Sequence, residues 1–329
     1  MLILSADEVR KALPMREAIH AMKQAYAALS AGKADVPLRI RLPIPRHEAV
    51  SLFMPAYAQT DEADALAVKV VSLFPKNPSR GLAYIQAAVL VFETDTGRAS
   101  ALLEGSSLTA IRTGAASGAA IDLLARKDSK VAALFGAGTQ GRTQLEAACT
   151  IRKIETVFIF DPHPEKAKAF TVEMKGKDFV PQDVRVAVSA KEAIENADIL
   201  CTATTSTKPV FDDKDLKAGT HISAVGSYTP EMQEVPAETL QRAKIFVDSR
   251  STAQEEAGDL IQPIRAGLFD ESHIHAELGE VILGKKPGRE SPDEITYFKS
   301  VGIAVQDAIA AQVALNNARK MNLGKEVEF

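Results

Sequence analysis

The second half of the chain alternates short apolar runs with amphipathic stretches, and this rhythm constrains the fold more than any other feature of the sequence. The runs KVAALF (130–135) and ETVFIFD (155–161) are nearly continuous in apolar residues, as expected of buried parallel strands. The stretches TQGRTQLEAACTIR (139–152) and PEKAKAFTVEMKG (164–176), which follow them, have helical spacing. Repeated units of this kind predict an α/β fold with a doubly wound parallel sheet and right-handed crossovers.

The segment GAGTQG joins the first of these strands to its helix and fits the pattern G-x-G-x-x-G. Gly136 can form the tight turn, Gly138 can let the backbone approach a pyrophosphate, and Gly141 can let helix and strand pack closely. The N–H groups at the helix N-terminus suit the phosphates. The alternative is a glycine turn that binds no ligand. We expect a dinucleotide to contact Gly136, Gly138, Thr139, Gln140 and Gly141.

Asp161 ends the next apolar run, about 20 residues after the last glycine, where a carboxylate accepts hydrogen bonds from the adenine ribose. A carboxylate there also repels a 2′-phosphate, which favours NADH over NADPH. His163 leaves NADPH open, because a partly charged imidazole tolerates a phosphate. The alternative role for Asp161 is to cap the helix that begins near Pro162.

Several basic residues stand in segments that are otherwise apolar or small. Lys69 is flanked by valines, and Arg112 lies in a long run of small and apolar residues. Arg39 and Arg41 share one face of an extended segment. Such cations suit an anionic small molecule, which a guanidinium grips with two parallel hydrogen bonds. The alternatives are a solvent face for Lys69 and the arginine pair, and a structural acid beside Arg112.

Three further polar residues carry weaker signals. Asp307, in GIAVQDAI, either lines the cofactor site or serves packing. His273 and His275, with Glu277, could suggest a metal site, but they lie in what reads as a polar connecting segment with no fourth ligand nearby, so no metal is expected.

The composition and charge exclude several classes of partner. The formal net charge is −4 and the pI is about 5.9, which gives no basic field for nucleic acid. The longest apolar runs fall far short of the roughly 20 residues that span a bilayer, so no membrane partner is expected. Cys149 and Cys201 are expected to be reduced core thiols, and with no signal peptide apparent they predict a cytoplasmic protein.

The remaining segments predict a second domain. A helix is expected over 14–32, and the β-branched segments between 36 and 97 favour an antiparallel or mixed sheet. An Ala- and Gly-rich helix is expected over 107–126. The stretch EITYFKSVGIAVQDAIAAQVALNNARKM (294–321) is expected to form one long helix that returns to this first domain.

A set of motifs along nearly the whole chain is more specific than the glycine segment. In order, they are LFMP (52–55), AVKVVSLFPKNPSRGL (67–82), SLTAIRTGAASGAAIDLLAR (107–126), GAGTQG (136–141), DILCTAT (198–204), AVGSYTPEMQEV (224–235) and FKSVGIAVQD (298–307). Together they resemble the ornithine cyclodeaminase/μ-crystallin family of nicotinamide-dependent enzymes. The resemblance implies a Rossmann-type domain, 121–304, inserted into a discontinuous α+β substrate-binding and dimerisation domain, 1–120 and 305–329. It also implies a homodimer formed through the sheet of that outer domain.

The resemblance also implies roles for individual residues. Arg41, Lys69 and Arg112 fall where the family holds the substrate carboxylate and the reacting nitrogen, and Met54 and Tyr228 fall beside the substrate. The positions that fall at the cofactor, in addition to the glycine segment and Asp161, are Arg112, Thr113, Thr202, Gly226, Ser227 and Gly302.

Two positions depart from the family pattern. Tyr228 stands where cyclodeaminases and alanine dehydrogenases have an aspartate for acid–base chemistry. Leu52 stands where cyclodeaminases have a glutamate that grips the distal ammonium of the substrate. A tyrosine with an ordinary pKa near ~10 is a poor base at neutral pH. The two departures argue against ornithine or lysine as substrate.

Branches of the family with this altered segment resemble ketimine reductases, so the resemblance implies reduction of a cyclic ketimine carboxylate, Δ1-pyrroline-2-carboxylate or Δ1-piperideine-2-carboxylate, to an L-imino acid such as proline. NADH is the expected hydride donor, with NADPH left open. The alternatives are a dehydrogenase acting on a simple 2-oxo acid such as pyruvate, an ornithine cyclodeaminase, and a crystallin-like protein that binds a small ligand without turnover.

Overall fold

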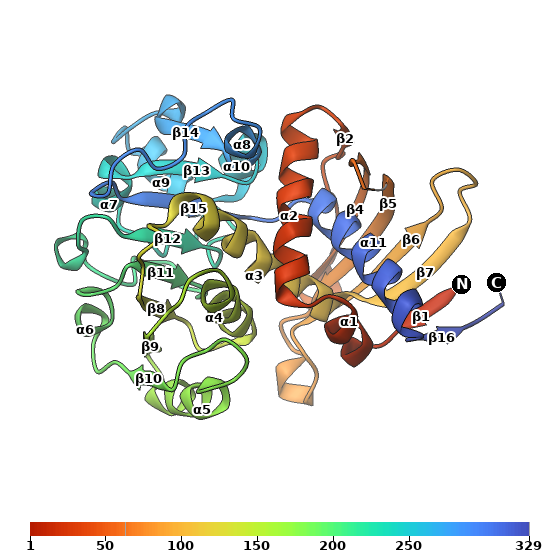
Figure 1. Cartoon of the computed structure of the whole chain (residues 1–329), viewed down its shortest axis with the longest axis horizontal. Coiled ribbons are helices and arrows are strands. Elements are labelled where there is room, and N and C mark those ends of the chain that lie inside the picture. Colours follow the sequence, from red (N-terminus) through yellow and green to blue (C-terminus); the bar gives the residue numbers. More distant parts are fainter. Residues whose placement is uncertain (63, 329) are drawn as a thin grey trace. The chain divides into compact units, whose positions relative to one another are not determined.

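The computed structural model describes residues 1–62 and 64–328, which form two compact units (Figure 1). Unit 1 consists of residues 1–112 and 303–329, and unit 2 consists of residues 113–302. The first boundary falls inside helix α3 (Gly105–Leu124), whereas the boundary expected from the sequence, after residue 120, falls later in the same helix. The second boundary lies two residues before the expected one, at 302 (304 − 302 = 2).

Unit 2 contains an eight-stranded sheet in which every neighbouring pair of strands is parallel. The order is β10-β9-β8-β11-β12-β15-β13-β14. The strands are β8 (Val131–Phe135), β9 (Thr156–Phe160), β10 (Asp183–Val186), β11 (Ile199–Thr202), β12 (His221–Ala224), β13 (Lys244–Val247), β14 (Ile274–Glu277) and β15 (Thr296–Lys299). The strand order reverses direction between β8 and β11, as in a doubly wound sheet, so the predicted α/β fold is confirmed.

Helices connect the strands of unit 2 and bury both faces of its sheet. They are α4 (Thr139–Ile151), α5 (Pro164–Met174), α6 (Ala190–Ile194), α7 (Ala237–Arg242), α8 (Arg250–Glu256), α9 (Gly258–Arg265) and α10 (Leu278–Ile282). One apolar cluster includes Leu145 and Phe170, and a second includes Ile222 and Leu240. Two separate clusters are expected when helices cover both faces of one parallel sheet.

Two expectations about unit 2 were wrong. Residues 294–321 do not form a single helix: Thr296–Lys299 is the buried strand β15, and helix α11 begins at Ala304. The β-branched and aromatic residues of this segment suit a buried strand, and Gly302, with φ of 91°, ends the extended chain. The segment around His273 and His275 is not a plain connection either, because it contains β14 at the edge of the sheet.

Unit 1 contains a mixed sheet of order β16-β1-β7-β6-β5-β4-β2, with β3 also paired to β4. Its strands are β1 (Leu2–Leu4), β2 (Ala34–Asp35), β3 (Ile40–Ile44), β4 (Ala49–Gln59), β5 (Asp64–Leu73), β6 (Ile85–Phe92), β7 (Ala99–Glu104) and β16 (Lys325–Glu326). The pair β1–β7 is parallel and the other pairs are antiparallel. The expected mixed sheet is therefore present.

Three helices of unit 1 pack on its sheet and on one another: α1 (Ala6–Ala12), α2 (Met15–Ser30) and α11 (Ala304–Met321). Helix α11 lies across β4, β5 and β6 and along α2 (Figure 1). Its alanines let it approach the sheet closely, which buries polar residues of its first turn beside the strands. Short 3₁₀ turns complete the chain at Pro45–His47, Pro78–Arg80, Asp213–Asp215 and Glu271–His273.

Within residues 1–62 and 64–328, no helix is both long enough and apolar enough to cross a membrane.

Candidate functional site

A buried cluster of charged side chains lies in unit 1, where strand β5 faces helix α11. Lys69 comes from the middle of β5, Arg112 from α3 and Asp307 from the first turn of α11. The Lys69 Nζ atom lies 2.7 Å from Asp307 Oδ2, and the Arg112 Nε atom lies 3.0 Å from Asp307 Oδ1. The contact between Lys69 and Asp307 is a buried ion pair. Segments from three distant parts of the chain thus meet at one carboxylate.

Neutral groups fix the position of Arg112 in this cluster. Its Nη1 donates to Gln306 Oε1 at 3.1 Å, and the Gln306 amide nitrogen donates to the Tyr26 hydroxyl oxygen at 2.7 Å. The N–H group of Ile303 also donates to Gln306 Oε1, at 2.9 Å. Among the residues that the structure describes, Arg112 Nη2 has no hydrogen-bond partner. The guanidinium is therefore held on two nitrogens and offers the third to a ligand.

Burial and neighbouring charges shift the pKa values of the cluster. Burial lowers the pKa of Lys69, Asp307 opposes burial and Arg112 adds to it, and together these effects bring the pKa to about 8. Burial raises the pKa of Asp307, but Arg112 and Lys69 outweigh burial and leave this pKa below its ordinary value. The cluster has two cationic groups and one carboxylate, so it suits a second carboxylate brought by a ligand. A lysine with a pKa near 8 can also exchange a proton at neutral pH.

The sheet register places other predicted site residues on the same face as Lys69. Met54 lies directly across from Lys69 on β4, and Leu52 lies two residues along that strand. Leu52 pairs in turn with Arg41 on β3. Paired residues of antiparallel strands project to the same side, so these four residues share one face. Met54 and Leu52 are buried, whereas Arg41 is exposed.

Arg39, two residues before Arg41, is partly buried. Its charge is one of the causes that lower the pKa of Lys69. Arg39 is therefore close enough to the buried cluster to influence it, while part of its side chain remains exposed.

The glycine segment of unit 2 has the shape that a dinucleotide needs. Gly136 has φ of 98°, and a Cβ atom there would lie 2.5 Å from the carbonyl oxygen of Ala203. Gly138 precedes α4, and a Cβ atom there would meet no other atom within 4 Å. No side chain caps α4, so the N–H groups of its first turn at Thr139 and Gln140 have no side-chain acceptor and are available to a ligand. These features fit a bound pyrophosphate.

Asp161 follows β9 and braces the glycine segment. Its Oδ2 accepts a hydrogen bond from the N–H group of Ala137 at 3.0 Å, and its Oδ1 accepts from the N–H group of His163 at 2.9 Å. The residue that caps α5 is His163, so the helix-capping alternative for Asp161 does not hold. Each carboxylate oxygen keeps a lone pair that a ribose hydroxyl can use.

The strand ends expected to contact the cofactor are tied to buried carboxylates that the sequence analysis did not single out. The Thr202 hydroxyl and the N–H groups of Gly226 and Ser227 all donate to Glu234 Oε2. The N–H group of Gly302 donates to Asp248 Oδ2 at 2.8 Å. The Thr202 side chain therefore points into the protein. Asp248 ends an apolar strand as Asp161 does, a signal that could have found it, whereas nothing in the sequence marks Glu234.

Thr113 and Tyr228, predicted to contact the cofactor and the substrate, lie outside the carboxylate clusters described above. The Thr113 carbonyl oxygen accepts a hydrogen bond from the Gln144 side chain at 3.2 Å. Thr113 and Tyr228 both belong to unit 2 and are partly buried.

The two histidines once considered as metal ligands bond to the backbone. His273 Nε2 lies 2.8 Å from the Leu240 carbonyl oxygen, and His275 Nε2 lies 3.0 Å from that of Pro287. In the part of the chain that the structure describes, no three histidine, cysteine, aspartate or glutamate side chains are grouped as metal ligands.

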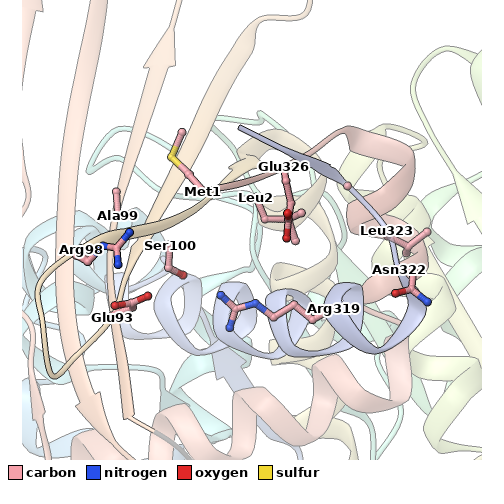
Figure 2. Close-up of a pocket in the computed structure, with 11 residues that line it drawn as sticks. Met1, Leu2, Glu93, Arg98, Ala99, Ser100, Arg319, Asn322, Leu323 and Glu326 are labelled. Atoms are coloured by element: carbon pink, nitrogen blue, oxygen red, sulfur yellow. The ribbon is translucent and has the colours of Figure 1, made fainter. Parts of the chain in front are cut away.

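A separate cavity of about 370 Å³ opens in unit 1 where β1, β7 and the end of α11 meet (Figure 2). Arg98 and Arg319 line it together with Glu93 and Glu326. Figure 2 shows the Arg319 side chain on α11 and the Arg98 side chain near Glu93. Its lining includes none of the site residues predicted from the sequence.

The chain matches the model of the ornithine cyclodeaminase/mu-crystallin family over residues 1–322. A Delta(1)-pyrroline-2-carboxylate reductase of Bacillus cereus is 43% identical over 330 residues, which cover 100% of both chains. The structure of Thermococcus litoralis Delta(1)-pyrroline-2-carboxylate reductase in complex with NADH and L-proline is 44% identical, with a TM-score of 0.94, and covers 99% of this chain and 100% of that one.

An archaeal alanine dehydrogenase dimer with bound NAD is also similar. It is 35% identical, with a TM-score of 0.91, over 100% of this chain and 99% of that one. The family model and these full-length similarities confirm the resemblance found in the sequence. The chain belongs to the ornithine cyclodeaminase/mu-crystallin family.

Proposed function

We propose that the protein reduces a cyclic ketimine 2-carboxylate, Δ1-pyrroline-2-carboxylate or Δ1-piperideine-2-carboxylate, to the corresponding L-imino acid with NADH. The observation that carries this proposal is the buried cluster of Lys69, Arg112 and Asp307. It combines an excess of positive charge for a carboxylate with an ammonium group whose pKa is about 8. The names of the similar reductases from Bacillus cereus and Thermococcus litoralis agree with this chemistry.

The substrate carboxylate binds Arg112 through the nitrogen that the cluster leaves available, and exposed Arg41 on the same sheet face provides a second cation. The apolar ring of the substrate packs against Met54 and Leu52, which share that face with Lys69. Leu52 offers no charge to a second amino group. This apolar surface favours a cyclic imine over a diamino acid.

Lys69 orients the imine nitrogen and supplies its proton, and Asp307 keeps Lys69 in the charged form until the transfer. When bound, NADH would supply the hydride for the C=N carbon. Addition of one hydride to carbon and one proton to nitrogen converts the double bond to a secondary amine. Lys69 then regains a proton from solvent. Positioning and charge provide most of the acceleration that the protein itself contributes.

Most of the cofactor contacts come from residues of unit 2. The pyrophosphate lies at Gly136, Gly138, Thr139, Gln140 and Gly141, with Asp161 on the adenine ribose. The remaining contacts come from Arg112, Thr113, Gly226, Ser227 and Gly302, and from the backbone at Thr202, because the Thr202 hydroxyl is bonded to Glu234. Tyr228 donates a hydrogen bond to the substrate. The charge of Asp161 favours NADH, with NADPH as the weaker donor.

The second candidate is a dehydrogenase that acts on a 2-oxo acid with ammonia, favoured by the 35% identity to the archaeal alanine dehydrogenase. Against it stands Tyr228, at the position where the family pattern has an acid–base aspartate. The cyclic imine already contains the C=N bond, so its reduction needs no group to assist ammonia addition.

We also infer that the protein is a homodimer. The face of the unit 1 sheet opposite Lys69 carries Ile40 and Leu42, which are 64% and 51% exposed, beside half-buried Phe53 and Val70. An apolar patch on a sheet favours a protein interface. Unit 1 of a second copy is the partner that fits it, and sedimentation at micromolar concentration tests this.

We place the protein in the cytoplasm, since both cysteines are buried and free.

The test is an assay of NADH oxidation with Δ1-pyrroline-2-carboxylate, with Δ1-piperideine-2-carboxylate and with pyruvate plus ammonia. The proposal predicts stoichiometric oxidation with a cyclic imine and much slower oxidation with pyruvate and ammonia. Fast NADH oxidation with pyruvate plus ammonia, and slow oxidation with both cyclic imines, would establish the second candidate instead. Ammonia release from ornithine with catalytic NAD would establish a cyclodeaminase, and NADH binding without turnover of any substrate would leave a ligand-binding role.

A further inference from the structure

Glu234 joins three segments at the carboxyl ends of the unit 2 strands. Its side chain is fully buried, and four donors converge on its two oxygens. Oε1 accepts from the N–H group of Thr204 at 2.6 Å. Oε2 accepts from the Thr202 hydroxyl at 2.9 Å and from the N–H groups of Gly226 and Ser227 at 2.8 and 3.3 Å. One side chain therefore sets the spacing between the segments that follow β11 and β12.

These segments are closely packed around Glu234. A Cβ atom on Gly226 would lie 2.2 Å from the Thr204 carbonyl oxygen and 2.4 Å from Glu234 Oε1. The neighbouring carbonyl of Ala203 lies against Gly136 of the glycine segment, where a Cβ atom would be 2.5 Å away. The segment 202–204 is therefore in close contact with Gly226 on one side and with Gly136 on the other.

Glu234 is itself held in place by a second buried acid, Asp259. Asp259 Oδ1 accepts from the N–H groups of Glu234 and Val235 at 2.6 and 3.1 Å. Its Oδ2 lies 3.2 Å from Lys299 Nζ and 3.2 Å from the Tyr297 hydroxyl. Burial raises the pKa of Glu234 and the charge of Lys299 opposes this effect. Two acids and one lysine, all fully buried, thus form a rigid support beneath the strand ends.

Burial of these charges costs desolvation free energy, and apolar residues of similar size would often stabilise a fold equally well. The location of the charges at the strand ends therefore indicates a role other than stability. In a doubly wound sheet the second group of strands receives the nicotinamide half of a dinucleotide at their carboxyl ends. The geometry points to Glu234 as a positioning residue that fixes the backbone of 202–204 and 226–227 for the nicotinamide half of the cofactor. This inference rests on the proposed function, since it deepens the assignment of NADH.

The variant Glu234→Gln tests the inference, because it keeps the size of the side chain and places an NH₂ group against at least one N–H or O–H donor. Asp198→Asn is a matched control. Asp198 also accepts from four donors, those of Lys130, Val131, Arg126 and Lys217. It lies at the opposite, amino end of β11. Both variants alter a carboxylate that accepts from four donors, but on different edges of one sheet, and two of the donors to Asp198 are partly exposed cations.

The readouts are the dissociation constants of NADH and of ADP, the second of which fills only the adenine half, together with the unfolding midpoint. We expect Glu234→Gln to weaken NADH about tenfold and to leave ADP binding unchanged. Asp198→Asn should lower the unfolding midpoint and leave both constants unchanged. Equal NADH binding in the wild type and in folded Glu234→Gln overturns the inference, as does an equal loss for NADH and ADP.

Thr202→Val provides a milder test if Glu234→Gln does not fold. It removes a single donor to Glu234 from a side chain that is fully buried. A smaller loss of NADH affinity, with ADP again unchanged, supports the inference, and an unchanged NADH constant contradicts it. A wild-type protein that binds no NADH would instead refute the proposed function, so the two failures are distinguishable.

Discussion

The ammonium group of Lys69 lies 2.7 Å from the carboxylate of Asp307, and both side chains are almost completely buried. Lys69 comes from a central strand and Asp307 from the last helix, so the contact forms only when both ends of the chain have folded together. The carboxylate raises a pKa that burial and Arg112 would otherwise lower still further. The Lys69–Asp307 pair thus keeps the pKa of the proton donor, Lys69, close to neutral pH.

The pH dependence of catalysis should report the Lys69 titration. We expect kcat/KM for the cyclic imine to fall above pH about 8, because Lys69 loses its proton there. In Asp307→Asn the falling limb should move to lower pH, since the variant removes the opposing charge that raises the lysine pKa. The measurement is kcat/KM from pH 6 to 10 (about one decade on each side of the limb).

If the limb stayed in place in Asp307→Asn, it would belong to the imine of the substrate instead. The same conclusion would follow if Lys69→Met retained an identical limb.

Removal of the ammonium group should affect chemistry rather than cofactor binding. Lys69→Met should lower kcat by roughly 10² to 10⁴, the usual contribution of a positioned proton donor, with the NADH dissociation constant unchanged. Lys76→Met is the matched control, since Lys76 is an exposed lysine paired with exposed Glu48. Wild-type kcat in Lys69→Met would contradict the role assigned to this residue.

Asp161 should set the preference between the two nicotinamide cofactors. Asp161→Asn keeps an oxygen that can accept from the Ala137 N–H group and removes the charge that repels a 2′-phosphate. We expect the ratio of kcat/KM for NADPH to that for NADH to rise about tenfold. Glu165→Gln, a change at a neighbouring exposed acid, should leave the ratio unaltered. An unchanged ratio in Asp161→Asn would show that another residue makes the choice.

His221 should make the protein less stable in mild acid. The ring is fully buried between Thr296 Oγ1 and Ser223 Oγ, and burial, with Arg289 and Arg152, holds its pKa well below 6.5. The unfolded chain binds a proton below pH about 6.5 that the folded chain rejects, so stability falls as the pH drops.

His221 binds about one proton on unfolding in this range, so the unfolding free energy should change by roughly 1.4 kcal/mol per pH unit. His221→Asn should flatten the dependence of the unfolding free energy between pH 6.5 and 5 (roughly the range of histidine titration). Exposed His163→Asn should retain the wild-type slope. Equal slopes in His221→Asn and the wild type would assign the effect elsewhere.

The features that local pattern determines could be predicted from the sequence. Buried parallel strands and their connecting helices have distinct periods, which identified the sheet of unit 2. Lys69 and Arg112 stood out because a charge in an apolar segment needs a partner. The strand Thr296–Lys299 was missed, because a short apolar run beside a long helical pattern has no period of its own.

The partners that only the tertiary fold brings together could not be predicted. Asp307 was left open between two roles, since nothing local shows that α11 places it against β5. Glu234 lies in an irregular segment, and its four donors come from elsewhere in the chain. Lys299 carried the same signal as Lys69, a lysine in a buried strand, and could have been found by the same argument.

The most direct test of the central claim follows the hydride itself. NADH deuterated at both C4 positions is incubated with the protein and Δ1-pyrroline-2-carboxylate, and the product is analysed by mass spectrometry and chiral chromatography. The account predicts L-proline with deuterium at C2, formed in step with NADH oxidation and nearly absent with Lys69→Met. Oxidation of the cofactor without labelled proline, or no oxidation at all, would contradict it.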